Sequence, residues 1–382
     1  MRTLLTLFLV FAAAVCDAEP RARDLGIPFD GETGPLNAIT DVAGVTVGHA
    51  TLIQDLADGH KVRTGVTAIL PRGRGSLKTP VFAGWFALNG AGEMTGTSWI
   101  EESGTLDGPV MLTNTHSIGA VHEATIAWRV RQGDADAAGY FWSTPVVAET
   151  WDGHLNDVNG FHVKSAHVEA ALGVATGGPV AEGNVGGGTG MICHEFKCGI
   201  GTASRRVEIG GVARLVGVLV QANYGRRENL LIAGVPVGRH LLEDRPAELA
   251  ASEGDTGSII IVVATDAPLL PHQLKRIARR AGMGLARMGS FAGDGSGDIF
   301  VAFSTANPSA LSAAGLSSAA FIGNDHLDSL FEATVQATEE AIVNAMVAAR
   351  DMQGQDGHYA KAIAHKDLVR LLKRYRRYRA AE

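Results

Sequence analysis

Short apolar runs rich in β-branched residues alternate with glycine-rich turns along almost the whole of this 382-residue chain. Such runs are typical of buried strands, and glycine allows tight turns between them. Glycine supplies 48 residues, close to twice its ~7 % share of an average soluble protein. The glycines show no period of three, which excludes collagen, and 46 % hydrophobic against 19 % charged residues excludes a disordered chain.

The order of the expected elements predicts a layered α/β sandwich. No linker rich in proline or serine interrupts residues 28–362. We expect strands at residues 45–50, 64–70, 217–222, 259–264 and 299–303. We expect helices at residues 118–132, 165–171, 272–288 and 327–352. Because strands and helices mix without strict βαβ alternation, they indicate packed layers of sheet and helix.

The N-terminus has the features of a secretory signal. A positive charge at Arg2 precedes twelve apolar or small residues at 4–15, and small residues precede a cut after Ala18. Twelve residues are too few for a membrane-spanning helix, which needs about 20. We therefore expect residues 1–18 to be removed and the mature protein to be periplasmic or secreted, without membrane contact; a short membrane anchor is the alternative interpretation.

The charge balance argues against a nucleic-acid partner. The chain has 33 Lys and Arg against 40 Asp and Glu, a net charge of −7 with neutral histidine, whereas nucleic-acid binding requires a broad positive surface. The basic run at 373–379 is short. It is typical of a solvated end or of an end that contacts another subunit.

Two cysteines remain once the signal is removed. Cys193 and Cys198 lie close together in the sequence and flank His194. A zinc site would need a second ligand pair, which the sequence lacks, so we predict no metal. A local disulfide in an oxidising compartment and a pair of buried thiols are both consistent with the spacing.

The glycine-rich segment 183–190 resembles a phosphate-binding loop only superficially. It lacks the Lys-Ser/Thr ending of a P-loop, and it does not match G-x-G-x-x-G between a strand and a helix. We therefore predict no nucleotide site. The segment indicates a place where the backbone approaches another group closely.

In residues 254–264, a turn rich in glycine precedes a strongly apolar strand whose first residue is a serine. If the bond between Gly257 and Ser258 breaks, Ser258 carries both a hydroxyl nucleophile and a free α-amine. An α-amine has a pKa near 8, so it can accept the hydroxyl proton as a general base. Taken alone, the same pattern is also that of an ordinary turn before a strand.

A second polar loop, residues 293–298, precedes another apolar strand. Its Ser296 and Asp298 could hydrogen-bond an amine and hold it over Ser258. Without Ser258 the loop would be interpreted as a simple polar turn.

Several longer stretches together resemble a known family, and the resemblance covers residues 21–371. They closely resemble the DmpA-type L-aminopeptidase/D-amidase-esterases and β-peptidyl aminopeptidases, at residues 36–42, 145–150, 183–190, 218–223, 257–258 and 264–269. The resemblance implies a four-layer αββα sandwich of the N-terminal-nucleophile-hydrolase kind. It also implies self-cleavage into a large chain, 19–257, and a small chain, 258–382, which remain associated in one domain and assemble as a tetramer of such pairs.

The resemblance also assigns catalytic roles by position. Ser258 corresponds to the nucleophile released by cleavage after Gly257. Ser296 and Asp298 correspond to the residues that orient the new α-amine, and Asn223 to the side chain that donates to the oxyanion. No metal or organic cofactor is implied.

Substrate recognition is implied at two further positions. Glu149 corresponds to the carboxylate that binds the substrate ammonium, which predicts short peptides, amino-acid amides or esters as substrates. Trp151 stands where the amidase-esterase type has tyrosine, and an indole cannot exchange a proton as a phenol does. Members specialised for β-peptides tend to have glutamate at Asp298 and can have asparagine at Gly257. The motif residues favour L-peptides and D-amides or esters, and β-peptide cleavage stays open.

Two other functions remain as alternatives. An acyltransferase of the ornithine-acetyltransferase kind resembles this architecture, but such enzymes typically cleave before threonine, and Ser258 and Glu149 argue against that function. In a non-catalytic periplasmic binding protein, Gly257 and Ser258 would form an ordinary turn.

Overall fold

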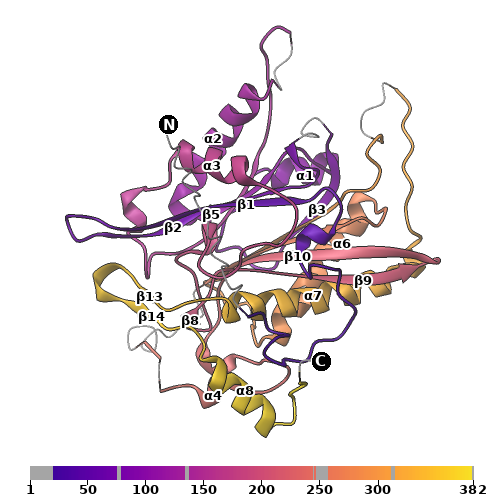
Figure 1. The fold of residues 1–382 in the computed structure, drawn as a ribbon. Coiled ribbons are helices and arrows are strands. Elements are labelled where there is room, and N and C mark those ends of the chain that lie inside the picture. The colour runs from indigo at the N-terminus through magenta and orange to yellow at the C-terminus, as the bar shows by residue number, and fades with distance from the viewer. Residues whose placement is uncertain are drawn as a thin grey trace, which may run out of the picture.

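Two β-sheets stack face to face and are covered by helices on both outer sides (Figure 1). The computed structural model describes residues 20–74, 79–133, 137–243, 245–246, 257–310 and 315–380. The predicted signal at 1–18 and the turn residues 254–256 lie outside these ranges.

The larger sheet has six strands in the order β4-β3-β12-β11-β10-β9. Their bounds are β3 Val81–Ala87, β4 Thr105–Leu106, β9 Ile200–Ile209, β10 Val212–Asn223, β11 Ser258–Thr265 and β12 Gly297–Ser304. All neighbours are antiparallel except β11 and β12, which run parallel. The catalytic candidates Ser258, Ser296 and Asp298 lie at the starts of β11 and β12, and these two parallel strands begin at the same end of the sheet.

The smaller sheet has four strands in the order β1-β2-β5-β6. Their bounds are β1 Thr46–Asp55, β2 Lys61–Leu70, β5 Val110–Asn114 and β6 Val146–Thr150. Two short hairpins complete the strands, β7 Ile192–Cys193 with β8 Phe196–Lys197, and β13 Met352–Gln353 with β14 Tyr359–Ala360.

Helices α6 and α7 pack on the outer face of the larger sheet, and α2 and α3 on the outer face of the smaller one (Figure 1). The helix bounds are α1 Thr97–Ser103, α2 Ile118–Arg131, α3 Ser165–Val174, α4 Val237–His240, α6 Pro271–Arg287, α7 Asp328–Val347 and α8 His365–Arg374. The order helix, sheet, sheet, helix confirms the αββα sandwich. No described helix is long and apolar enough to cross a membrane.

Strand β11 shows why its sequence is continuously apolar. Ile260 and Val262 belong to the core between the two sheets, whereas Ile259 and Ile261 belong to the core beneath α6 and α7. Side chains alternate between the faces of a strand, and both faces of β11 are buried. By the same alternation, Ser258 begins the strand on the face toward the smaller sheet.

The predicted strands and helices are all present, with shifts at their ends. The expected helix 327–352 ends at Val347. Among the longer elements, strands β3, β5, β6 and β9 and helices α1 and α8 were not predicted. Strand β9 buries polar residues, so its sequence lacks the alternation of apolar and polar residues that predicts a strand. Its Arg205 is fully buried and pairs with Glu340 of α7, with Nη2 2.7 Å from Oε2.

Candidate active site

A pocket of about 220 Å³ opens where the two sheets meet, at the start of β11 and the end of β6. It contains four of the residues predicted for the site. Its lining residues are Ala91, Thr115, Glu149, Trp151, Gly257, Ser258 and Gly295. The predicted nucleophile and the predicted ammonium-binding carboxylate thus come from opposite sheets and face one space.

Ser258 lies against the carbonyl of the residue before it. Its buried Oγ donates a hydrogen bond to Gly257 O at 2.6 Å, and Gly297 N donates to the same oxygen at 3.0 Å. A Cβ at position 257 would lie 2.4 Å from Asn223 O, closer than real Cβ contacts allow. Glycine is therefore required here by packing as well as by any need for a flexible peptide.

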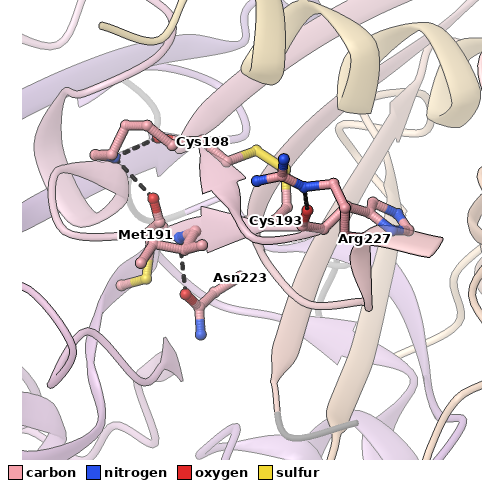
Figure 2. Close-up of a disulfide and its surroundings, with 8 residues drawn as sticks. Met191, Cys193, Cys198, Asn223 and Arg227 are labelled. Atoms are coloured by element: carbon pink, nitrogen blue, oxygen red, sulfur yellow. Dashed lines mark hydrogen bonds between the residues drawn. A yellow bond between two sulfur atoms is a disulfide. The ribbon is translucent and has the colours of Figure 1, made fainter. Parts of the chain in front are cut away.

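Asn223 is brought directly opposite Ser258. The two residues pair at the ends of β10 and β11, and both lie on the face toward the smaller sheet, as Leu219 and Ile260 do. The Oδ1 of Asn223 accepts a hydrogen bond from Ile192 N at 2.9 Å. Figure 2 shows the amide nitrogen of Asn223 directed away from this contact. The side chain therefore presents a hydrogen-bond donor, and not an acceptor, to the other side.

Ser296 and Asp298 form a hydrogen-bonded pair beside the first residues of β11. Ser296 Oγ donates to Asp298 Oδ1 at 2.7 Å, and both side chains are buried. They flank Gly297, which is the register partner of Ser258 in β12. The structure thus places both predicted residues next to the serine backbone, where an amine on Ser258 would form.

Asn89 completes this pair and was missed from the sequence. Its Nδ2 donates to Asp298 Oδ2 at 3.1 Å and to Gly293 O at 3.2 Å. It follows strand β3 in a glycine-rich turn, residues 88–92, of the same kind as the turn around Ser296. That similarity is the signal that could have identified it, and the hydrogen bonds hold the Asp298 carboxylate in one orientation.

Glu149 is a buried carboxylate with two donors. Its Oε1 accepts a hydrogen bond from Glu93 N at 3.0 Å, and its Oε2 accepts one from the Thr115 hydroxyl. Burial raises the pKa of Glu149, and these two hydrogen bonds act in the opposite direction. A buried carboxylate that lines a pocket is suited to a cationic group, because an ammonium would offset its lost hydration. Thr115 was also missed; it directly follows β5.

Trp151 forms a wall of the pocket next to Glu149. Its side chain is 48 % exposed, and a Cβ at Gly153 would lie 2.5 Å from the indole. The ring therefore lies flat over a residue without a side chain. Its place at the mouth of the pocket agrees with a role in shaping the space for substrate.

The glycine-rich segment 183–190 does not line the pocket. Its central residues form a buried 3-10 turn in which Gly186 N and Gly187 N donate to the hydroxyls of Thr51 and Thr67 at 2.8 and 3.1 Å. The backbone of this segment does approach another group closely, as expected, and that group is strands β1 and β2 of the same protein.

Cys193 and Cys198 are bonded to each other, which decides between the two interpretations of the cysteine pair. Across the described ranges, no group of three or more His, Cys, Asp or Glu side chains is arranged to hold a metal ion.

A buried serine in register with an asparagine, and in one pocket with a buried carboxylate of an αββα sandwich, is an arrangement suited to a serine hydrolase that acts next to a substrate amine. The model of peptidase family S58 matches residues 37–360. The chain therefore belongs to peptidase family S58, and it is a serine-type aminopeptidase with the Ntn-hydrolase fold.

Relatives agree over nearly the full chain. β-Peptidyl aminopeptidase BapA of Sphingosinicella microcystinivorans is 53 % identical, covering 98 % of this chain and 97 % of that protein. The structure of L-aminopeptidase D-Ala-esterase/amidase from Ochrobactrum anthropi is 51 % identical with a TM-score of 0.89, covering 94 % of this chain and 100 % of the other. A β-aminopeptidase from Burkholderia sp. is 48 % identical with a TM-score of 0.83, covering 93 % and 99 %. The family resemblance seen in the sequence is thus confirmed.

Proposed function

We propose that this protein is an exported aminopeptidase that cuts its own Gly257–Ser258 bond and then releases N-terminal residues from short peptides, amino-acid amides or esters. The observation that carries the proposal is the pocket shared by Ser258 and Glu149. Export rests on the signal-like residues 1–18, and the mature protein is expected to be periplasmic or secreted.

The contacts of Gly257 support the proposed self-cleavage. Ser258 Oγ adds to the Gly257 carbonyl carbon, and the oxygen that becomes negative already accepts a hydrogen bond from Gly297 N. The C–N bond then breaks, the acyl group of Gly257 stays on Oγ as an ester, and the serine nitrogen takes up the proton that Oγ lost and becomes an amine. Water hydrolyses the ester, which leaves a carboxylate on Gly257 and a free hydroxyl on Ser258.

Turnover uses the same serine with its new amine as the base. The substrate ammonium binds Glu149, and the Ser258 amine takes the hydroxyl proton, with Ser296 as a relay. Oγ attacks the first carbonyl, Asn223 Nδ2 donates to the oxyanion, and the leaving amine takes the proton. Water then releases the acyl group by the same steps. Asp298 holds Ser296 in place through the 2.7 Å hydrogen bond.

Hydrolysis of matched p-nitroanilides of L-alanine, D-alanine and β-alanine tests the substrate class. The relatives named for β-peptidyl and for L-aminopeptidase or D-amidase activity are almost equally similar to this chain, so we propose that more than one of the three is cleaved. Asp298 and Gly257 favour the L- and D-substrates. If none is cleaved by the purified enzyme, the proposed function is wrong.

A denaturing gel tests self-cleavage separately. At 39.9 kDa for 382 residues, residues 258–382 correspond to about 13 kDa and residues 19–257 to about 25 kDa. Ser258→Ala should give one uncut band and no activity, whereas wild type should give both bands. An active enzyme with a single uncut band would contradict the mechanism.

The assembly is proposed to be a tetramer of cleaved pairs that requires no metal or cofactor. Light scattering of the eluting protein gives the mass directly, and activity after treatment with a chelator tests the need for a metal.

A further inference from the structure

We propose that residues 191–198, here named the cystine hairpin, are a positioning element that fixes the orientation of the Asn223 amide in the active site. The inference rests on the proposed role of Asn223 as donor to the oxyanion. Ile192 N donates a hydrogen bond to the Asn223 side chain, 2.9 Å from Oδ1. Ile192 is the first residue of β7 in this hairpin.

The orientation of the amide decides whether Asn223 can act. One end of a carboxamide only donates and the other only accepts. A backbone N–H can be satisfied only by the accepting end, so Ile192 N selects the orientation in which Nδ2 points the other way (Figure 2). If the amide turned over, its oxygen would face the developing negative charge and repel it.

The two strands of the cystine hairpin are too short to keep Ile192 N in place by themselves. Strands β7 and β8 have two residues each, and such a short pair is unstable alone. The two turn residues, His194 and Glu195, have φ of 48° and 60°, a left-handed backbone that is unfavourable for residues with a Cβ. Contacts from outside the strands must therefore maintain it.

Arg227 holds the turn end of the hairpin. Its Nε donates to His194 O at 2.9 Å, the hydrogen bond drawn from Arg227 in Figure 2. Its Nη2 donates to Glu195 O, and the guanidinium lies over the Phe196 ring. The turn is also attached to the strand that carries Asn223, because His194 N donates to Tyr224 O at 2.7 Å. The turn of the cystine hairpin is therefore linked directly to the end of β10.

The disulfide and Lys197 close the base of the hairpin. Cys193 and Cys198 are bonded and fully buried, and the buried Lys197 Nζ donates to Met191 O at 2.7 Å and to Cys198 O at 2.5 Å (Figure 2). Two thiols need more space than a bonded pair of sulfurs, so reduction forces Cys193 away from Cys198. Because Cys193 follows Ile192, that displacement reaches the N–H that orients Asn223.

The test measures kcat and KM for the Cys193→Ser/Cys198→Ser double variant on whichever p-nitroanilide wild type cleaves. Loss of an oxyanion donor costs about 10²–10³ in kcat. We therefore expect Asn223→Ala to lose that much, and the double cysteine variant to lose roughly tenfold or more with KM within about twofold. Adding the cysteine changes to Asn223→Ala should lower kcat no further. Lys197→Met, which leaves the disulfide in place, should act in the same direction.

Val168→Ala in α3 is the control for loss of stability, because Val168 is buried in the core on the far side of the smaller sheet. It should lower the melting temperature and leave kcat unchanged. If the cysteine variant does not fold, partial reduction of wild type with a phosphine, with thiols counted by alkylation, should lower kcat in proportion to the reduced fraction. Unchanged kcat without the disulfide, or an equal further loss in the Asn223→Ala background, would overturn the inference. Full activity of Asn223→Ala would instead show that the proposed oxyanion role is wrong.

Discussion

At the scale of single residues, the surroundings of Ser258 and Glu149 give these common side chains unusual properties. Ser258 is an ordinary serine, but its Oγ lies 2.6 Å from the carbonyl oxygen of Gly257. Glu149 is an ordinary carboxylate, but burial raises its pKa and leaves it in a pocket with two neutral donors. The proposed roles of Ser258 in self-cleavage and of Glu149 in binding an ammonium group rest on these surroundings.

Glu149→Gln should weaken recognition of a free amine. It removes a charge-assisted hydrogen bond, which typically contributes about 1.5–3 kcal/mol, so kcat/KM should fall roughly 10- to 100-fold for alanine p-nitroanilides. Loss of a buried charge should leave thermal stability unchanged or slightly higher. Steady-state kinetics and a melting curve on the same sample measure both. An unchanged kcat/KM would show that another group binds the ammonium.

Asp152 should make stability depend on pH. Burial raises the pKa of its carboxyl from 3.8 to about 6, and Asn156 Nδ2 donates to its Oδ1 at 3.1 Å. The folded state therefore binds the proton more tightly, so this contribution to stability is complete below about pH 4 and is lost as the pH rises through 6. Two pKa units correspond to about 3 kcal/mol.

The variant Asp152→Asn isolates this effect. The free energy of unfolding of Asp152→Asn relative to wild type should increase by about 2.5 kcal/mol between pH 4 and pH 7. Urea unfolding at several pH values provides the measurement. A difference that does not change with pH would mean that Asp152 is not the titrating group.

At the scale of elements, one helix and one strand are joined through a buried charge. Glu340 of α7 binds Arg205 of β9 at 2.7 Å and Arg23 at 2.8 Å. Burial alone would raise the pKa of Glu340, but the two guanidinium groups lower it. The carboxylate therefore stays charged and ties the N-terminal segment, the edge strand and the helix together.

Glu340→Gln should destabilise the protein without touching the site. Removing one partner of a buried ion pair typically costs about 3–5 kcal/mol, because the remaining charge stays buried and uncompensated. The melting temperature should fall, while kcat per folded molecule stays at the wild-type value. Arg206→Gln, which breaks only the exposed pair with Glu32, is the matched control and should cost less than about 1 kcal/mol.

The elements differ in how well the sequence predicts them, and the reason is visible in particular residues. Helix α6 has apolar Leu274, Ile277 and Leu285 on one face against the sheet, so its period of 3.6 is clear. Strand β9 buries Arg205 and Ser204 instead. Most hydrogen bonds of these two side chains join distant segments, such as Arg205 Nη2 to Glu340 Oε2 and Ser204 Oγ to Asp41 Oδ2, and no local pattern can indicate them.

At the scale of the whole molecule, cleavage should not separate the two chains. Strand β11 would belong to the small chain and β10 to the large one, and they are joined by eight register pairs. Apolar residues from both sides of the cut also form the core between the sheets. The 13 and 25 kDa species should therefore elute together from a sizing column without denaturant. Elution as separate species would contradict this prediction.

The sequence by itself predicted a layered α/β sandwich and Ser258 as a candidate nucleophile after a glycine-rich turn. Apolar periodicity and glycine-rich turns are local patterns, so a few consecutive residues are enough to show them. The family resemblance added Asn223, Glu149 and Trp151. Only the tertiary structure decided that Asn223 pairs with Ser258 on the neighbouring strand, that Asn89 and Thr115 orient the carboxylates, and that Cys193 pairs with Cys198. These contacts join residues far apart in the chain or depend on side-chain direction, and both are set by how the sheets pack.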